Sequence, residues 1–188
     1  MLRPHQRGDF LAWREVRLAN QQWLSPWEAT ATTPWEWRHE RGDYRAMLRG
    51  QREAISFGQA MPFVICYRGA LTGQLTVGSI VRGAFYSANI GYWIDGRLAG
   101  RGIMPHALAM ACDFCFFAAG LHRIEINIRP ENIASRRVVE KLGFRYEGFH
   151  PRFLHIDGDW RDHMGFALTV EDVLPGGALA RWRVHRQP

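Results

Sequence analysis

The pattern of apolar and polar positions changes once along the chain, near Met61. Before Met61, apolar residues recur at helical spacing. Thr33 has the chemistry of a helix cap, and Pro34 fits the first position of the helix that would follow. Two helices are therefore predicted, at residues 9–20 with Asp9 as the N-cap and at residues 33–57 with an interruption near 41–43.

From Met61 onward, strand patterns dominate and turn residues separate them. An apolar stretch of helical length ends at Gly120, and a shorter helix opens near Asn132 and ends at Gly143. Strands are predicted at 63–67, 71–81, 85–94, 124–128, 145–156 and 160–168, and helices at 103–119 and 130–142. This order predicts an α+β fold with a mixed, mostly antiparallel sheet flanked by helices.

The totals indicate one domain over residues 1–188, with a C-terminal tail from about residue 175. No run approaches the roughly 18 apolar residues of a membrane-spanning helix, and the start lacks a signal peptide, so we expect a cytoplasmic protein without membrane contact. Three cysteines, Cys66, Cys112 and Cys115, do not indicate a disulfide framework. Cys112 and Cys115 are interpreted as buried helical thiols rather than redox or metal-binding residues. The histidines are dispersed, so no metal site is expected.

The formal charge is +6, and Lys141 is the only lysine among the 24 basic residues. The stretch from Arg181 to Arg186 concentrates positive charge at the C-terminus. We interpret it first as a solvated or docked tail and second as an arm that contacts RNA. Monomer and homodimer both remain open.

The segment from Gly91 to Met104 carries the strongest chemical signal. An apolar strand leads into a loop with Gly96, Gly100 and Gly102, and a long helix follows. Glycines let backbone N–H groups turn toward one point, and a helix start adds free N–H groups and a positive dipole end. The loop is therefore a candidate diphosphate seat. Its spacing fits neither a P-loop nor a Rossmann fingerprint.

Arg97, Gly100 and Gly102 match an ordered pattern: Arg or Gln, Gly three positions later, and Gly or Ala two positions after that. This pattern resembles the acetyl-coenzyme A signature of the GNAT acetyltransferases. Residues 132–144 resemble the next motif of that family through Asn132, Ser135, Glu140, Lys141, Gly143 and Phe144. Further matches at 102–104, 121–125, 130–132 and 156–163 resemble the branch that acetylates the N-terminal alanine of ribosomal proteins.

The resemblance implies a GNAT fold with acetyl-coenzyme A as cosubstrate. It also implies a sheet that splays to admit the pantetheine arm. The backbone of Tyr92, Trp93 and Ile94 would pair with that arm, and an N–H near Trp93 would polarise the thioester carbonyl. Asn132 would bond the arm as well as cap its helix. The implied diphosphate-binding residues are Arg97, Leu98, Ala99, Gly100, Arg101 and Gly102.

The catalytic residues are less determined. Relatives often place a proton-donating tyrosine where this chain has Val139, so that donor is missing at this position. Ser135 lies one turn earlier on the same helical face and is a candidate weak acid or orienter, or simply a first-turn serine bonded to backbone. Glu125 is the candidate base, or a strand glutamate paired with arginine. Glu147, Asp162 and His163 are lesser candidates, and bulk water is the last alternative.

The branch resemblance implies that the acceptor is a protein or peptide N-terminus. The first candidate is the N-terminal alanine of a ribosomal protein such as S5. Two alternatives stay open: a small-amine acetyltransferase, and a non-catalytic coenzyme A-binding module. Acidic side chains in the acceptor groove would favour a polycation, and an open, mildly apolar groove would favour a peptide. Candidate groove residues, or else core residues, are Trp23, Trp27, Trp35 and Trp37.

Overall fold

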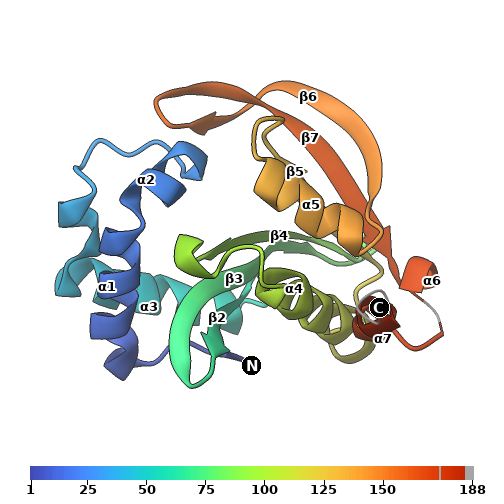
Figure 1. Cartoon of the computed structure of the whole chain (residues 1–188). Helices are drawn as coiled ribbons and strands as arrows, with labels where there is room; N and C mark the ends of the chain where they lie inside the picture. Colours follow the sequence, from blue (N-terminus) through green and yellow to red (C-terminus); the bar gives the residue numbers. More distant parts are fainter. Residues whose placement is uncertain (174, 185–188) are drawn as a thin grey trace.

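The computed structural model describes residues 1–173 and 175–184. Seven strands form one sheet in the order β1-β2-β3-β4-β5-β7-β6 (Figure 1). Only β4 and β5 are parallel, and every other neighbouring pair is antiparallel, which confirms the mixed, mostly antiparallel sheet. The strands are β1 Leu2–Arg3, β2 Met61–Tyr67, β3 Ala70–Val81, β4 Ser87–Ile94, β5 Arg123–Ile128, β6 Arg145–Ile156 and β7 Asp159–Thr169.

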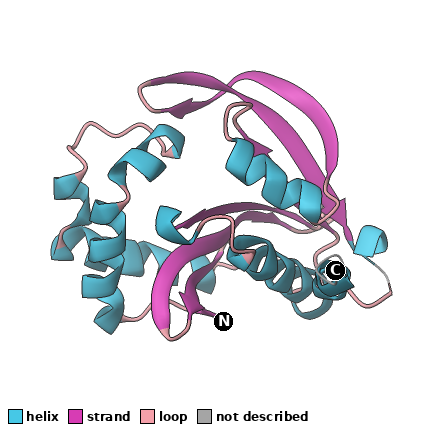
Figure 2. Ribbon diagram, viewed as in Figure 1, coloured by secondary structure: helices cyan, strands magenta, loops and turns pink. Residues whose placement is uncertain are grey.

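Helices cover both faces of this sheet (Figure 2). Successive side chains of a strand point to opposite faces, and Val64 and Ile65 of β2 accordingly belong to separate buried clusters. Val64 packs with α1 and α3 residues such as Trp13 and Tyr44, whereas Ile65 packs in the larger cluster that contains α4. The helices are α1 Phe10–Ala19, α2 Gln21–Leu24, α3 Arg41–Ser56, α4 Ile103–Asp113, α5 Ile133–Lys141, α6 Val170–Val173 and α7 Ala178–Val184.

The predicted start of the second helix at Thr33 is wrong. Residues 36–39 form a separate 3-10 turn, and α3 begins at Arg41. The indole of Trp35 is buried and donates to the carbonyl of Arg17, which ties this turn to α1. The helix then starts after Glu40, whose backbone N–H is accepted by the Asp43 carboxylate. The interruption expected near 41–43 is therefore the true boundary.

Asp9 precedes α1 as predicted but does not cap it. Its carboxylate instead accepts hydrogen bonds from Arg3 and from the backbone N–H of Gln6. These bonds hold the short, unpredicted strand β1 beside the start of α1. The pKa of Asp9 is lowered, because these hydrogen bonds outweigh the opposing effect of burial.

The C-terminal tail includes a helix that packs on α4. The Asp113 carboxylate at the end of α4 accepts from the backbone N–H of Ala178 at 2.6 Å and of Leu179 at 3.1 Å, and so caps α7. Trp182 is buried in the main core beside α4. The docked interpretation therefore holds for residues 178–184, whereas residues 185 and 186 of the basic stretch lie outside the described residues.

The apolar segment predicted as one helix over 103–119 has two parts. The α-helix α4 ends at Asp113, and residues 114–118 continue it as a π-helical turn. Cys112 and Cys115 are buried free thiols, as predicted. Within 1–173 and 175–184, no helix is long and apolar enough to cross a membrane. The same residues contain no cluster of three potential metal ligands.

The sheet opens between β4 and β5. Their parallel pairing covers only three positions, Ser87 with Arg123, Ala88 with Ile124, and Asn89 with Glu125. Beyond Asn89, β4 stays paired with β3 as far as Ile94 but leaves β5. The second half of β4 therefore presents one backbone edge to an opening in the sheet, as the family resemblance implied.

Candidate functional site

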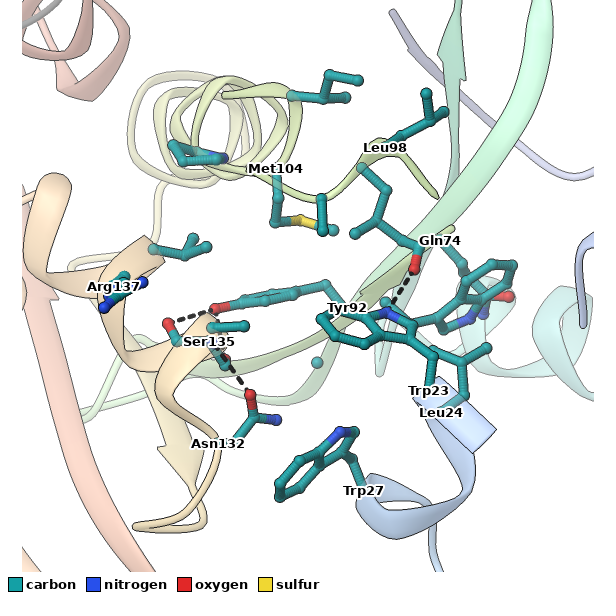
Figure 3. Close-up of a pocket in the computed structure, with 18 of the residues that line it drawn as sticks. Trp23, Leu24, Trp27, Gln74, Tyr92, Leu98, Met104, Asn132, Ser135 and Arg137 are labelled. Carbon is teal, nitrogen blue, oxygen red and sulfur yellow. Dashed lines mark hydrogen bonds between the residues drawn. The ribbon is translucent and has the colours of Figure 1, made fainter. Parts of the chain in front are cut away.

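A cavity of about 670 Å³ occupies this opening. One wall is the exposed half of β4, and the second is formed by the loop 96–102 with the start of α4. The start of α5 forms the third wall, and α2 with the segment that follows it forms the fourth (Figure 3). This volume lies in the range of small-molecule and cofactor sites.

The β4 wall is brought close to β3 by a glycine. Gly73 pairs with Ile94, and a Cβ at Gly73 would lie 2.4 Å from the carbonyl oxygen of Trp93, so this approach requires glycine. Tyr92, Trp93 and Ile94 all line the cavity, and their contacts with the coenzyme stay a prediction. The carbonyl of Ile94 already accepts from the indole N–H of Trp23 at 3.1 Å. That bond joins β4 to α2 across the cavity wall (Figure 3).

The loop after β4 is anchored to α1 through Asn20. The Asn20 amide oxygen accepts from the backbone N–H of Gly96 at 2.8 Å, and its amide nitrogen donates to the Val16 carbonyl and to Asp95. Asp95 is buried, and hydrogen bonds from Arg97 hold its pKa below the usual value. Sequence reasoning missed this anchor, because Asn20 and Gly96 are 76 residues apart and nothing local links them.

Glycines form the part of the loop that faces the cavity. Gly100 has φ +79° and Gly102 has φ +77°, in the left-handed region that glycine enters without strain. Gly102 occupies the N-cap position of α4, and no side chain caps this helix. The N–H groups of its first turn and its positive dipole end are therefore available to an anion. Anion sites at helix starts have these features, and diphosphate binding here stays a prediction.

The two arginines of the loop do not line the cavity. Arg97 is bound to Asp95 through its backbone N–H and its guanidinium, and Arg101 is exposed. Leu98, Ala99, Gly100 and Gly102 line the wall. The seat in this structure thus consists of backbone and uncharged side chains. Diphosphate contacts by Arg97 and Arg101 stay predictions.

The α5 wall begins with the predicted cap. The Asn132 side-chain oxygen accepts from the backbone N–H of Ser135 at 3.0 Å, and both residues line the cavity. Val139 is fully buried, so the tyrosine position of the relatives holds a core residue here. A tyrosine hydroxyl from another element nevertheless reaches the first turn of α5. The Tyr92 hydroxyl of β4 lies 2.9 Å from the Ser135 hydroxyl (Figure 3).

The Tyr92 side chain is a functional candidate that sequence reasoning missed, since only its backbone was considered. Burial raises the pKa of Tyr92 above its usual value, so the phenol stays protonated at neutral pH. A protonated phenol beside Ser135 can donate to the serine oxygen, which leaves the serine O–H free to donate into the cavity.

Glu125, the candidate base, lies outside the cavity wall. It accepts from Arg123 Nε at 2.7 Å, and the same guanidinium also pairs with Glu147. This is the arginine pairing that the sequence analysis kept as its alternative, and the role of base stays a prediction. Asp162 accepts from the backbone N–H of Arg152, and His163 is bonded to the Arg161 carbonyl.

The four clustered tryptophans divide between the two roles left open for them. Trp23 and Trp27 line the cavity. Trp35 is buried beneath Arg17, and Trp37 is 69% exposed outside the wall. Glu28 also lines the cavity and is the one acidic side chain on its described wall. Sequence reasoning missed Glu28, because its place depends on the long connection between α2 and α3.

Comparison with known proteins agrees with this geometry. The family model described as an acetyltransferase (GNAT) domain matches residues 1–145. The chain is 33% identical over 171 residues to the ribosomal protein uS5-alanine N-acetyltransferase of Escherichia coli (strain K12), covering 88% of this chain and 86% of that one. It is 40% identical over 102 residues to the probable N-acetyltransferase YjcK of Bacillus subtilis, a match that spans about half of each protein, 54% and 56%.

A solved structure is similar along nearly the whole chain. Mycobacterium smegmatis RimJ in complex with CoA-disulfide superposes with a TM-score of 0.95 at 44% identity, covering 98% of this chain and 88% of that one. A ribosomal-protein-S5-alanine acetyltransferase from Vibrio fischeri gives a TM-score of 0.82 at 27% identity, covering 93% and 94%. The splayed sheet, the glycine seat at the start of α4 and the match over residues 1–145 together show that the chain belongs to the GNAT family of acetyltransferases.

Proposed function

We propose that this protein transfers an acetyl group from acetyl-coenzyme A to the N-terminal α-amine of a protein, with the N-terminal alanine of a ribosomal protein such as S5 as its first candidate. The observation that carries this proposal is the composition of the cavity. One end has a glycine seat suited to a diphosphate, and the other end is an aromatic groove with a single carboxylate.

Different parts of the site bind different parts of acetyl-coenzyme A. The start of α4 holds the diphosphate through backbone N–H groups. The free edge of β4 pairs with the amides of the extended pantetheine arm, and Asn132 faces the same path. When bound, acetyl-coenzyme A supplies an activated thioester. A backbone N–H near Trp93 then stabilises negative charge on the carbonyl oxygen under attack.

The Tyr92–Ser135 pair stabilises the departing sulfur. The two hydroxyls lie 2.9 Å apart, and their geometry allows either one to be the donor. With Tyr92 as the donor to the serine oxygen, the serine O–H donates to the thiolate as it forms. Because the phenol stays protonated, the pair acts as a donor over the whole neutral range. The pair would thus fill the donor role that relatives often give to a tyrosine at the position of Val139.

The preference for an α-amine has a simple chemical basis. The attacking amine must be neutral, and an α-amine has a pKa near 8, whereas a lysine amine near 10.4 costs about 3 kcal/mol more to deprotonate at neutral pH. A polyamine site would be expected to carry several acidic groups. The described wall carries only Glu28, which supports an acceptor with one amine at the reacting end.

Mass spectrometry of acetyl-coenzyme A reactions tests the proposal. The panel holds peptides with N-terminal Ala, Ser or Met, N-blocked peptides that contain lysine, and a mixture of polyamines. Acetylation at the α-amine of the Ala or Ser peptides is the expected result. Acetylation of the small amines alone, or coenzyme binding without any product, would overturn the proposal.

A further inference from the structure

The segment after α2 closes one side of the acceptor groove. Ala29 forms a β-bridge with Ile156, and the backbone N–H of Thr30 donates to the carbonyl of His155 at 3.1 Å. The N–H of Asp157 donates back to the carbonyl of Glu28 at 3.2 Å. These bonds fix the segment against the outer end of the β6–β7 hairpin, next to α2 (Figure 1). The backbone position of Glu28 is therefore well defined.

Only one of the two carboxylate oxygens of Glu28 has a hydrogen-bond partner among the described residues. One oxygen, Oε1, accepts from Arg17 Nη1 at 2.7 Å. The other oxygen has no hydrogen bond or ion pair with another described residue, and the side chain is 30% exposed while it lines the cavity. The carboxylate thus presents one free acceptor oxygen to the groove.

Arg17 is fixed from three sides. Its guanidinium lies 4.6 Å from the ring of Trp35 and 5.2 Å from the ring of Trp93. Its Nε donates to His39 Nε2 at 2.9 Å, while His39 Nδ1–H donates to the Trp35 carbonyl. These two bonds require the neutral form of His39, and burial, aided by the nearby Arg17, lowers the pKa of His39. These contacts hold Arg17 beside Glu28.

A purely structural role would explain why an anion lies beside Arg17. A buried arginine needs an anion beside it. That need does not explain why the anion lies on the cavity wall with an open oxygen, in a groove otherwise lined by Trp23 and Trp27. Indole rings and a carboxylate are groups that bind a charged amine, and a carboxylate also accepts a hydrogen bond from a neutral one.

We propose that Glu28 binds the α-amine of the acceptor through its free carboxylate oxygen, and that Arg17 is a positioning residue that aims it. This inference rests on the proposed function only in that the acceptor is an amine. The amine donates a hydrogen bond to Glu28 and is held on the groove side of β4, where Trp93 lies. One carboxylate suits one amine, so the site selects acceptors with a single free amine at the reacting end.

The test uses Glu28→Gln, because glutamine can still accept from Arg17 but carries no charge. The KM for the best wild-type acceptor, peptide or small amine, is expected to rise about 10- to 100-fold, the range for a lost hydrogen bond to a charged group. The KM for acetyl-coenzyme A is expected to stay unchanged. Glu28→Asp, which keeps the charge on a shorter side chain, should recover part of the affinity.

A binding measurement separates recognition from packing. By calorimetry, Glu28→Gln should weaken binding of the free-amine acceptor, but not of the same acceptor after N-acetylation. Glu40→Gln is the matched control, since Glu40 pairs with Arg14 at 2.8 Å on the outer surface and does not line the cavity. An unchanged acceptor KM in Glu28→Gln, or an equal loss for free and acetylated acceptors, would overturn the inference. Wild-type turnover of small amines but not peptides would reject the proposed function and still leave this test valid.

Discussion

The Tyr92–Ser135 hydroxyl pair makes a quantitative prediction for Tyr92→Phe. The change removes one oxygen and leaves the half-buried ring in place. The lost bond is the 2.9 Å contact between two uncharged hydroxyls, worth about 0.5–1.5 kcal/mol to stability. Ser135 faces the cavity, so water can replace the phenol as its partner. The melting temperature should therefore fall by only about 1–6 °C in a chain of 188 residues.

The effect on turnover should exceed the effect on stability. If Ser135 donates to the departing sulfur and Tyr92 strengthens that donation, kcat should fall about tenfold in Tyr92→Phe, a transition-state loss of about 1.4 kcal/mol. The KM values should stay near those of the wild type, since the bond acts as charge develops on sulfur. Ser135→Ala, which removes the donor itself, should cost more, about 100-fold.

The decisive assay is a double-mutant cycle measured in single-turnover mode, where coenzyme thiol release reports the chemical step. With Ser135 already changed to Ala, the further change of Tyr92 to Phe should have little effect, because its partner is gone. An unchanged kcat in Tyr92→Phe would refute the reasoning. Independent, multiplying losses from the two changes would refute it equally.

Three further predictions concern the supports of the site and the ends of the fold. Asn20→Ala leaves the backbone N–H of Gly96 without its acceptor, so the loop after β4 should loosen. The dissociation constant for coenzyme A, measured by calorimetry, should then rise about tenfold. An unchanged dissociation constant would contradict the anchoring role of Asn20. Because His39 has a lowered pKa, it stays neutral in the fold while the unfolded chain takes up a proton, so stability should fall as pH drops below about 6.5. Thermal melts at pH 7.5 and 5 check this, and His39→Gln should show a smaller difference between the two. Asp113→Ala removes the cap of α7 and should lower the free energy of unfolding, measured by urea titration, by about 1 kcal/mol. The KM for acetyl-coenzyme A should not rise. An unchanged urea midpoint of unfolding would argue against the docked helix.

The features that sequence predicted well are local. The backbone angles of a short loop require the glycines at 100 and 102. Asn132 caps the helix that follows it by accepting from a backbone N–H only three residues away. Patterns of this kind involve neighbours along the chain, so spacing alone reveals them.

The features that sequence missed join distant segments. Tyr92 and Ser135 are 43 residues apart, and Asp113 and Ala178 are 65 apart. No spacing rule links such pairs before the chain folds. The helix start at Thr33 failed for a related reason, because the tertiary contact of Trp35 with Arg17 holds that turn apart from α3.

The most direct test of the account is acetylation of ribosomal protein S5 itself, prepared with a free N-terminus from the organism that encodes this chain. The protein is incubated with acetyl-coenzyme A and the enzyme, and the modified position is located by tandem mass spectrometry. The expected result is one acetyl group on the N-terminal α-amine and none on lysine side chains. An unmodified N-terminus, or acetylation confined to lysines, would contradict it.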